Sequence, residues 1–135
     1  MFLFDLTEEQ KELFIDLAIG VVEANGVVDK SEKELLARYC REMALEYREK
    51  ANITDYKMVI EKLKEVSDEA VLRKISIEII ALMYADNDLA EEENEILDQM
   101  QNIFDFSTHT MGELIFVTKH LLLSLSLIQG VTLRV

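Results

Sequence analysis

The chain contains no proline and only four glycines among its 135 residues. A β-sheet domain of this size needs many tight turns, and tight turns depend on glycine, proline and asparagine. Half of the residues are apolar, which is enough to form one hydrophobic core in a chain of this length. These features predict a single all-α domain, folded as a compact bundle of six to seven helices.

Two segments with helical spacing of apolar residues superpose when the chain is aligned on itself with Glu32 placed on Glu93. Repeat one covers about 7–47 and repeat two about 68–107, and a C-terminal helix follows at about 110–126. Each repeat is predicted to be a helix, an acidic turn and a second helix. In both repeats the glutamate follows a helix stop at the same offset. Helical periodicity alone does not explain that match, so we infer an internal repeat.

Helix boundaries follow from capping signals. Thr7 and Gln10 have the spacing of a capping box at the start of the first helix, and Asn25-Gly26 is a typical stop. The pair Thr110 and Glu113 predicts another capping box for the last helix, which we expect to end near Leu125. The conformation of residues 127–135 stays open.

The repeated turn has the pattern small residue, Asp or Asn, Gly or Asn, any residue, hydrophobic residue. A glutamate follows seven residues after the Asp or Asn: Asn25 with Glu32, and Asp86 with Glu93. This pattern resembles the TerB family, a tellurite-resistance-associated helical domain that also occurs in some membrane-anchored DnaJ co-chaperones. The resemblance covers residues 7 to about 125. It implies a compact bundle of about seven helices, a role in stress response or in membrane-associated assemblies, and an acidic metal-binding surface, but no established reaction.

The formal net charge is −13, and the charge is unevenly distributed. Residues 75–118 contain ten acidic residues and no lysine or arginine. Such a surface repels nucleic acid and anionic membranes. The expected partners are therefore divalent cations or a protein with a basic surface.

The candidate metal ligands are the acidic residues around the two turns. Asp86, Asp88 and Glu93 form the better set, and Asp29 and Glu32 form the weaker one. Hard cations such as Ca²⁺ or Mg²⁺ prefer carboxylate oxygens, although the second turn lacks the ligand spacing of an EF-hand. We favour the interpretation that these acids only cap helix N-termini, where they interact with free amides and the helix dipole, and the cation site is the alternative.

Asp16 and Glu78 interrupt the two most apolar helices. A buried carboxylate needs a partner, and we expect a tyrosine hydroxyl or a lysine on a neighbouring helix rather than a metal. His109 and His120 lack the spacing of a di-iron bundle and are expected to be exposed. Cys40, the only cysteine, is expected to pack in the core.

The most apolar stretch, residues 114–128, contains Lys119 and His120. It is shorter than the roughly 20 residues needed to span a bilayer, so no membrane insertion is expected. The stretch is predicted to be core, with a dimer interface as the alternative, so the chain is a monomer or a homodimer. The N-terminus lacks the basic region of a signal peptide, which favours a cytoplasmic location.

No nucleophile–base pair, glycine-rich phosphate loop or cysteine–histidine cluster occurs in the sequence. The sequence therefore predicts a non-enzymatic binding or scaffolding module of the TerB-like type. A protein that binds divalent cations at the second acidic turn is the alternative, and a metal-dependent hydrolase that uses acidic residues is a weaker one.

Overall fold

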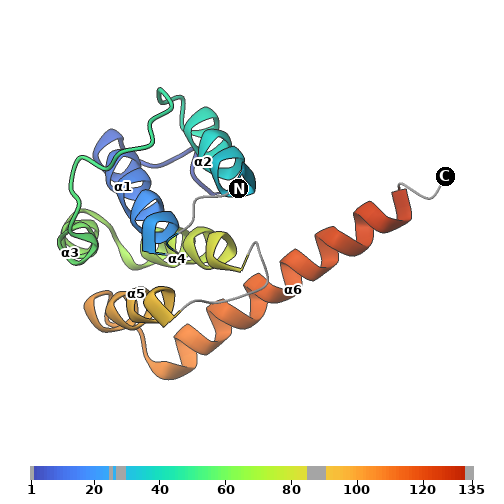
Figure 1. Ribbon diagram of the computed structural model, residues 1–135. Helices are drawn as coiled ribbons and strands as arrows, with labels where there is room; N and C mark the ends of the chain where they lie inside the picture. The colour runs from blue at the N-terminus through green and yellow to red at the C-terminus, as the bar shows by residue number, and fades with distance from the viewer. Residues whose placement is uncertain (1, 25, 27–29, 85–90, 133–135) are drawn as a thin grey trace.

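The structure, a computed structural model, describes residues 2–24, 26, 30–84 and 91–132. These residues form α1 (Glu8–Ala24), α2 (Lys30–Glu42), α3 (Tyr56–Val66), α4 (Glu69–Met83), α5 (Glu91–Ile103) and α6 (Thr108–Thr132). No strand occurs within these ranges, and the prediction of an all-α bundle is confirmed. Figure 1 shows α1 to α5 gathered into one body, from which the end of α6 extends.

Helix α1 lies at the centre of the body and contacts α2, α3, α4 and α5. It buries ten of its 17 residues, because apolar side chains cover almost its whole circumference. Helix α4 buries eight of its 15 residues and packs against α1. Helices α1 and α4 therefore supply the centre of the core, as their wide apolar surfaces predict.

The alignment that places Glu32 on Glu93 also matches the helices of the structure. Helices α1 and α4 begin at equivalent positions, and α2 and α5 both begin and end at equivalent positions. Seven of the eight buried residues of α4 have a buried counterpart in α1 under the same alignment. The two units therefore share helix boundaries and buried faces, and not only the spacing of their apolar residues.

The first helix begins as its capping box predicts. The amide of Thr7 donates to Oε1 of Gln10 at 2.9 Å, and the amide of Gln10 donates to the Thr7 hydroxyl at 3.2 Å. At the other end of α1, Gly26 has a left-handed φ of 80°, which fits the predicted stop.

Helix α6 begins at Thr108, near the predicted start, but its cap and its end differ from the prediction. Its cap is Ser107, whose hydroxyl accepts from the amide of Thr110 at 3.0 Å, so the predicted Thr110–Glu113 capping box is wrong. The helix continues to Thr132, past the predicted end near Leu125. Residues 126–132 contain no proline, and their single glycine costs only about 1 kcal/mol, which does not end a helix.

Candidate interaction surface

The first half of α6 belongs to the body. Met111, Leu114 and Thr118 are buried, and α6 contacts α4. The Thr118 hydroxyl donates to the carbonyl of Leu114 at 2.7 Å, which satisfies this polar group in an apolar contact. The ammonium of Lys119 lies 4.6 Å from the ring centre of Tyr84, at the end of α4. This cation–π contact holds the middle of α6 against the body.

The buried positions belong to a seam that runs on along the helix. The seam consists of Met111, Leu114, Thr118, Leu121, Leu125 and Ile128, at alternating intervals of three and four residues. This spacing is typical of helices that pack lengthwise against another helix. The exposed fraction rises from 0% at Thr118 to 45% at Leu125 and 57% at Ile128. The seam thus extends beyond its partner within the chain, and the prediction that residues 114–128 form core is wrong for the second half of α6.

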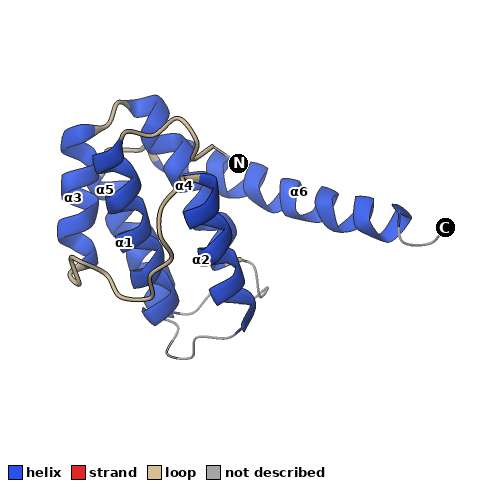
Figure 2. Ribbon diagram, turned by 90° about the horizontal axis from the view of Figure 1, so that it is seen from above, coloured by secondary structure: helices blue, strands red, loops and turns tan. Residues whose placement is uncertain are grey.

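The opposite side of the same helix is also apolar. Phe116, Leu123 and Leu127 are each more than half exposed, and the His120 ring lies 4.2 Å from the ring of Phe116. Figures 1 and 2 show the C-terminal part of α6 extending away from the other helices. Scattered exposed leucines are ordinary, but a contiguous run on one helix is typical of an interaction surface.

By length and composition alone, Thr108–Gly130 could cross a membrane, and only 17% of its most apolar window is buried. The prediction of a stretch too short to span is therefore wrong, because it ended the helix too early. Only the part from Leu121 to Thr132 extends from the body, however, and a helical segment of that length measures about 18 Å. The hydrocarbon core of a bilayer is about 30 Å thick. The extended part alone is too short to cross it.

A groove of about 750 Å³ lies where the seam leaves the body. The N-terminal segment, α2, α4 and α6 line it. Its apolar lining comprises Phe2, Leu35, Tyr39, Ile77, Ala81, Leu121, Leu122 and Leu125, and its charged lining comprises Glu34, Arg38, Arg41, Glu42 and Glu78. The lining of the groove is therefore mainly apolar and includes charges of both signs.

Glu78 and Tyr39 form one wall of this groove. The Glu78 carboxylate accepts from the amide of Phe2 at 2.9 Å, and its carbonyl accepts from the Tyr39 hydroxyl at 3.1 Å. Burial raises the pKa of Tyr39 far above its usual value of 10.0, and the carboxylates of Glu78 and Glu42 add to the shift. The phenol therefore stays a hydrogen-bond donor. One partner of the Glu78 carboxylate is thus the backbone amide of Phe2, which the sequence analysis did not predict.

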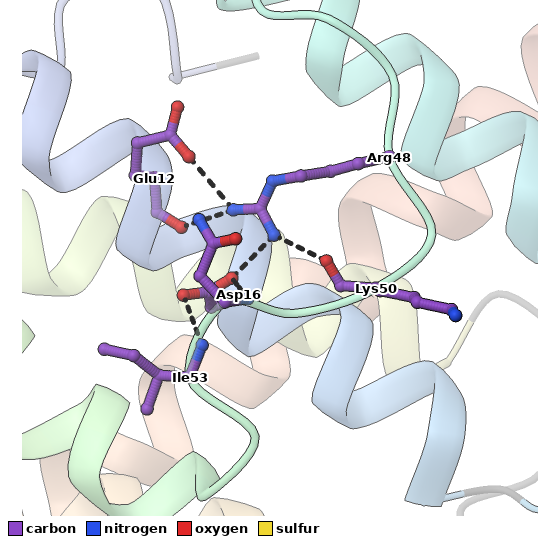
Figure 3. Close-up of polar contacts among 6 residues, drawn as sticks. Glu12, Asp16, Arg48, Lys50 and Ile53 are labelled. Carbon is purple, nitrogen blue, oxygen red and sulfur yellow. Dashed lines mark hydrogen bonds and ion pairs between the residues drawn. The ribbon is translucent and has the colours of Figure 1, made fainter.

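Asp16 ties α1 to the segment between α2 and α3 (Figure 3). Its carboxylate accepts from the Arg48 guanidinium at 2.7 Å and from the amides of Asn52 and Ile53 at 2.8 and 3.2 Å. Arg48 also pairs with Glu12 at 3.0 Å. Both oxygens of this 3% exposed carboxylate are thus satisfied, which makes Asp16 a structural residue and not a metal ligand.

Of the five predicted metal ligands, two lie among the described residues. Glu32 and Glu93 occupy the first turns of α2 and α5 and are only 7% and 3% exposed. Asp29, Asp86 and Asp88 lie outside the described residues. Within the described part of the chain, no group of three or more His, Cys, Asp or Glu side chains could hold a metal ion. The ion site at the second turn, which includes residues outside that part, stays a prediction.

Helix α5 presents carboxylates to solvent. Glu91, Glu92, Glu95 and Asp98 are exposed, and none of them forms a salt bridge with another described residue. We call these four residues the acidic face of α5. Four of the ten acidic residues in 75–118 therefore lie together on one exposed helix face.

The histidines and the cysteine lie as predicted. His109 is exposed, with its Nε2 atom 2.7 Å from the Glu113 carboxylate, and His120 is exposed beside Phe116. Cys40 is buried, and this burial raises the pKa of its thiol.

Sequence reasoning missed two features of this region. The groove is lined by segments that lie far apart in the chain, so no local sequence pattern predicts it. The seam could have been found, because its intervals of three and four residues continue past Leu125. The turn pattern that resembles TerB lies partly outside the described residues, and its two described glutamates, Glu32 and Glu93, are buried at equivalent positions. The chain matches no protein-family model, no curated protein and no solved structure.

Proposed function

We propose that the protein is a non-enzymatic binding and scaffolding module of the TerB-like type, acting in the cytoplasm. It docks a protein partner on the extended half of α6 and in the groove at its base. The observation that carries the proposal is the run of large apolar side chains exposed on α6 after Thr118. Covering apolar surface contributes about 25 cal/mol per Å², and helix-in-groove docking is a common use of such a surface. A role in stress response or tellurite resistance rests on the TerB resemblance alone.

The acidic face of α5 is a second surface, suited to a partner with a basic region. It is exposed, and Glu91, Glu92, Glu95 and Asp98 pair with no described cation. Exposed charges of one sign steer association and make it sensitive to salt. The same charge argues against nucleic acid as a partner.

The buried polar residues support a non-enzymatic role. Asp16 binds an arginine and two amides, Tyr39 donates to a carbonyl, and Cys40 is buried with a raised pKa. Each of these groups is used for packing or hydrogen bonding. This arrangement suits a rigid platform for binding.

The test is the size of the protein in extract from the cells that express it. We expect the tagged full chain to elute from gel filtration above its own 15.6 kDa. The double variant Leu125→Gln, Ile128→Gln should elute at monomer size, because it places polar groups on the seam. The matched control Glu61→Gln, Glu65→Gln changes two exposed residues of α3 and should elute like the parent. A parent chain that elutes as a monomer would refute the proposal.

A further inference from the structure

We propose that the partner on α6 is a second copy of this chain. The two α6 helices pack antiparallel along Leu121, Leu125 and Ile128, and the end of each helix lies over the groove of the other copy. This inference rests on the proposed function and names its partner. It leaves the acidic face of α5 free for a different protein.

Continuity with an existing helix contact is the first argument. The positions that bury Met111, Leu114 and Thr118 against the body continue without a break in spacing into Leu121, Leu125 and Ile128. Leu121 is half-buried and Leu125 and Ile128 are exposed, although all three are aliphatic. A seam at this spacing accepts another helix along its whole length. The exposed part of the seam is therefore suited to packing on another helix.

Self-complementarity is the second argument. A two-fold axis brings the same patch of two copies together, so each copy must carry both sides of the contact. Each copy here carries an extended apolar helix and, at its base, a groove lined by Phe2, Leu35 and Tyr39. An antiparallel arrangement places the helix end of one copy beside the groove of the other. One symmetric contact then covers the extended helix and the groove of both copies.

The charge distribution selects the antiparallel direction. All 27 acidic and 12 of the 14 basic residues precede Leu114, so residues 1–113 carry −15 and residues 114–135 carry +2. Parallel helices would place two strongly acidic bodies side by side, which costs energy. Antiparallel helices separate the two acidic bodies. The charge distribution therefore favours the antiparallel arrangement.

A membrane is a poorer occupant of the same surface. The extended half of α6 is too short to cross a bilayer unless Met111, Leu114 and Thr118 leave the core. The acidic body would also be repelled by anionic lipid. A bilayer, moreover, requires no regular seam, whereas α6 has one.

The first experiment is sedimentation equilibrium of the purified full chain. We expect twice the monomer mass of 15.6 kDa. Leu125→Gln with Ile128→Gln should return the mass to that of a monomer, whereas Leu123→Gln with Leu127→Gln, on the opposite side of α6, should leave the dimer intact. Unchanged circular dichroism would show that both variants fold. A monomeric parent chain, or a dimer lost equally in both variants, would overturn the inference.

The result also separates the two proposals. If the pure chain is a monomer and the extract species is larger and depends on Leu125 and Ile128, the proposed function stands and the second copy is refuted. If both are monomers, both fail. A monomer that co-sediments with phosphatidylcholine vesicles, with or without phosphatidylserine, would identify lipid as the occupant and refute the second copy.

Single cysteines test the direction of pairing. Leu121→Cys, Leu125→Cys and Ile128→Cys are each oxidised, with the native Cys40 buried and silent. A parallel pair would cross-link at all three positions, because each residue faces its own copy. An antiparallel pair cross-links only at the position on the two-fold axis, and Leu123→Cys, on the opposite side, should not react. Cross-linking at all three seam positions would overturn the antiparallel arrangement.

Discussion

Ala44 and Asp105 occupy equivalent places in the two repeats, just after the ends of α2 and α5, and both have a left-handed backbone. Their φ angles are 56° and 60°. The amide that follows each residue donates to the carbonyl five residues back, at 2.8 Å after Ala44 and 3.0 Å after Asp105. This pattern is the Schellman motif, in which glycine is the favoured residue. The repeat therefore extends to the local backbone geometry that ends each second helix.

We predict that Ala44→Gly stabilises the protein. Alanine incurs a steric penalty of about 1 kcal/mol at positive φ that glycine does not, although glycine loses part of this gain through its freer unfolded chain. The free energy of unfolding in urea should rise by roughly 0.5–1 kcal/mol. The matched control is Ala37→Gly inside α2, which should lower it by about 1 kcal/mol. A loss of stability in Ala44→Gly would contradict this account of the helix end.

Much of the fold could be predicted because its signals are local. The Thr7–Gln10 box and the Asn25-Gly26 stop bracket α1 closely, and the absence of proline excludes a turn-rich sheet. The left-handed ends of α2 and α5 could not be predicted, because neither Ala44 nor Asp105 is a residue type that requires a positive φ. That geometry is imposed by what packs on either side, and the spacing of apolar residues does not record it.

The candidate surface was harder to predict for a different physical reason. The apolarity of residues 114–128 shows that they need cover, but it does not show whether the cover comes from the same chain. Thr118 and Leu125 lie on one seam, yet Thr118 is buried against the body and Leu125 is 45% exposed. The difference depends on where α4 ends relative to α6. This is a tertiary property that periodicity cannot report.

Breaking the Asp16–Arg48 pair should destabilise the protein strongly. The contact is 2.7 Å, Asp16 is buried, and Arg48 is partly buried. Arg48→Met leaves a buried carboxylate with two amide donors only, so we expect a loss of roughly 2–4 kcal/mol in urea unfolding. The control is Arg73→Met, which removes an exposed i,i+4 pair with Glu69 and should cost less than about 1 kcal/mol. Equal losses in the two variants would show that burial does not strengthen the Asp16 pair.

The raised pKa of Tyr39 predicts an alkaline loss of stability. The phenol ionises near pH 10 in the unfolded chain but not in the folded protein, because burial and then the nearby Glu78 raise its pKa. Above pH 10 the folded protein therefore keeps the phenol proton that the unfolded chain loses. The contribution of Tyr39 to the free energy of unfolding is fully present below about pH 9 and is lost as the pH rises above 10. Tyr39→Phe should lose about 1 kcal/mol at pH 7, from its hydrogen bond, and show a shallower decline above pH 10. The free energy of unfolding in urea is measured at several pH values for both proteins. If it falls equally steeply above pH 10 in Tyr39→Phe and in the parent chain, the prediction is contradicted.

Divalent cations should bind at the second turn if the acidic residues there are ligands and not only caps. Calorimetric titration with Ca²⁺, Mg²⁺, Mn²⁺ and Zn²⁺ measures this directly, and a bound ion should also raise the melting temperature. Asp86→Asn with Glu93→Gln should abolish the heat, because it removes two of the three predicted ligands, including the buried Glu93. The matched pair in the first repeat, Asp29→Asn with Glu32→Gln, should leave most of it, since Asn25 there replaces the leading carboxylate. If no ion gives heat or a melting shift, the turn acids serve the helix ends alone, as the burial of Glu32 and Glu93 at equivalent positions allows.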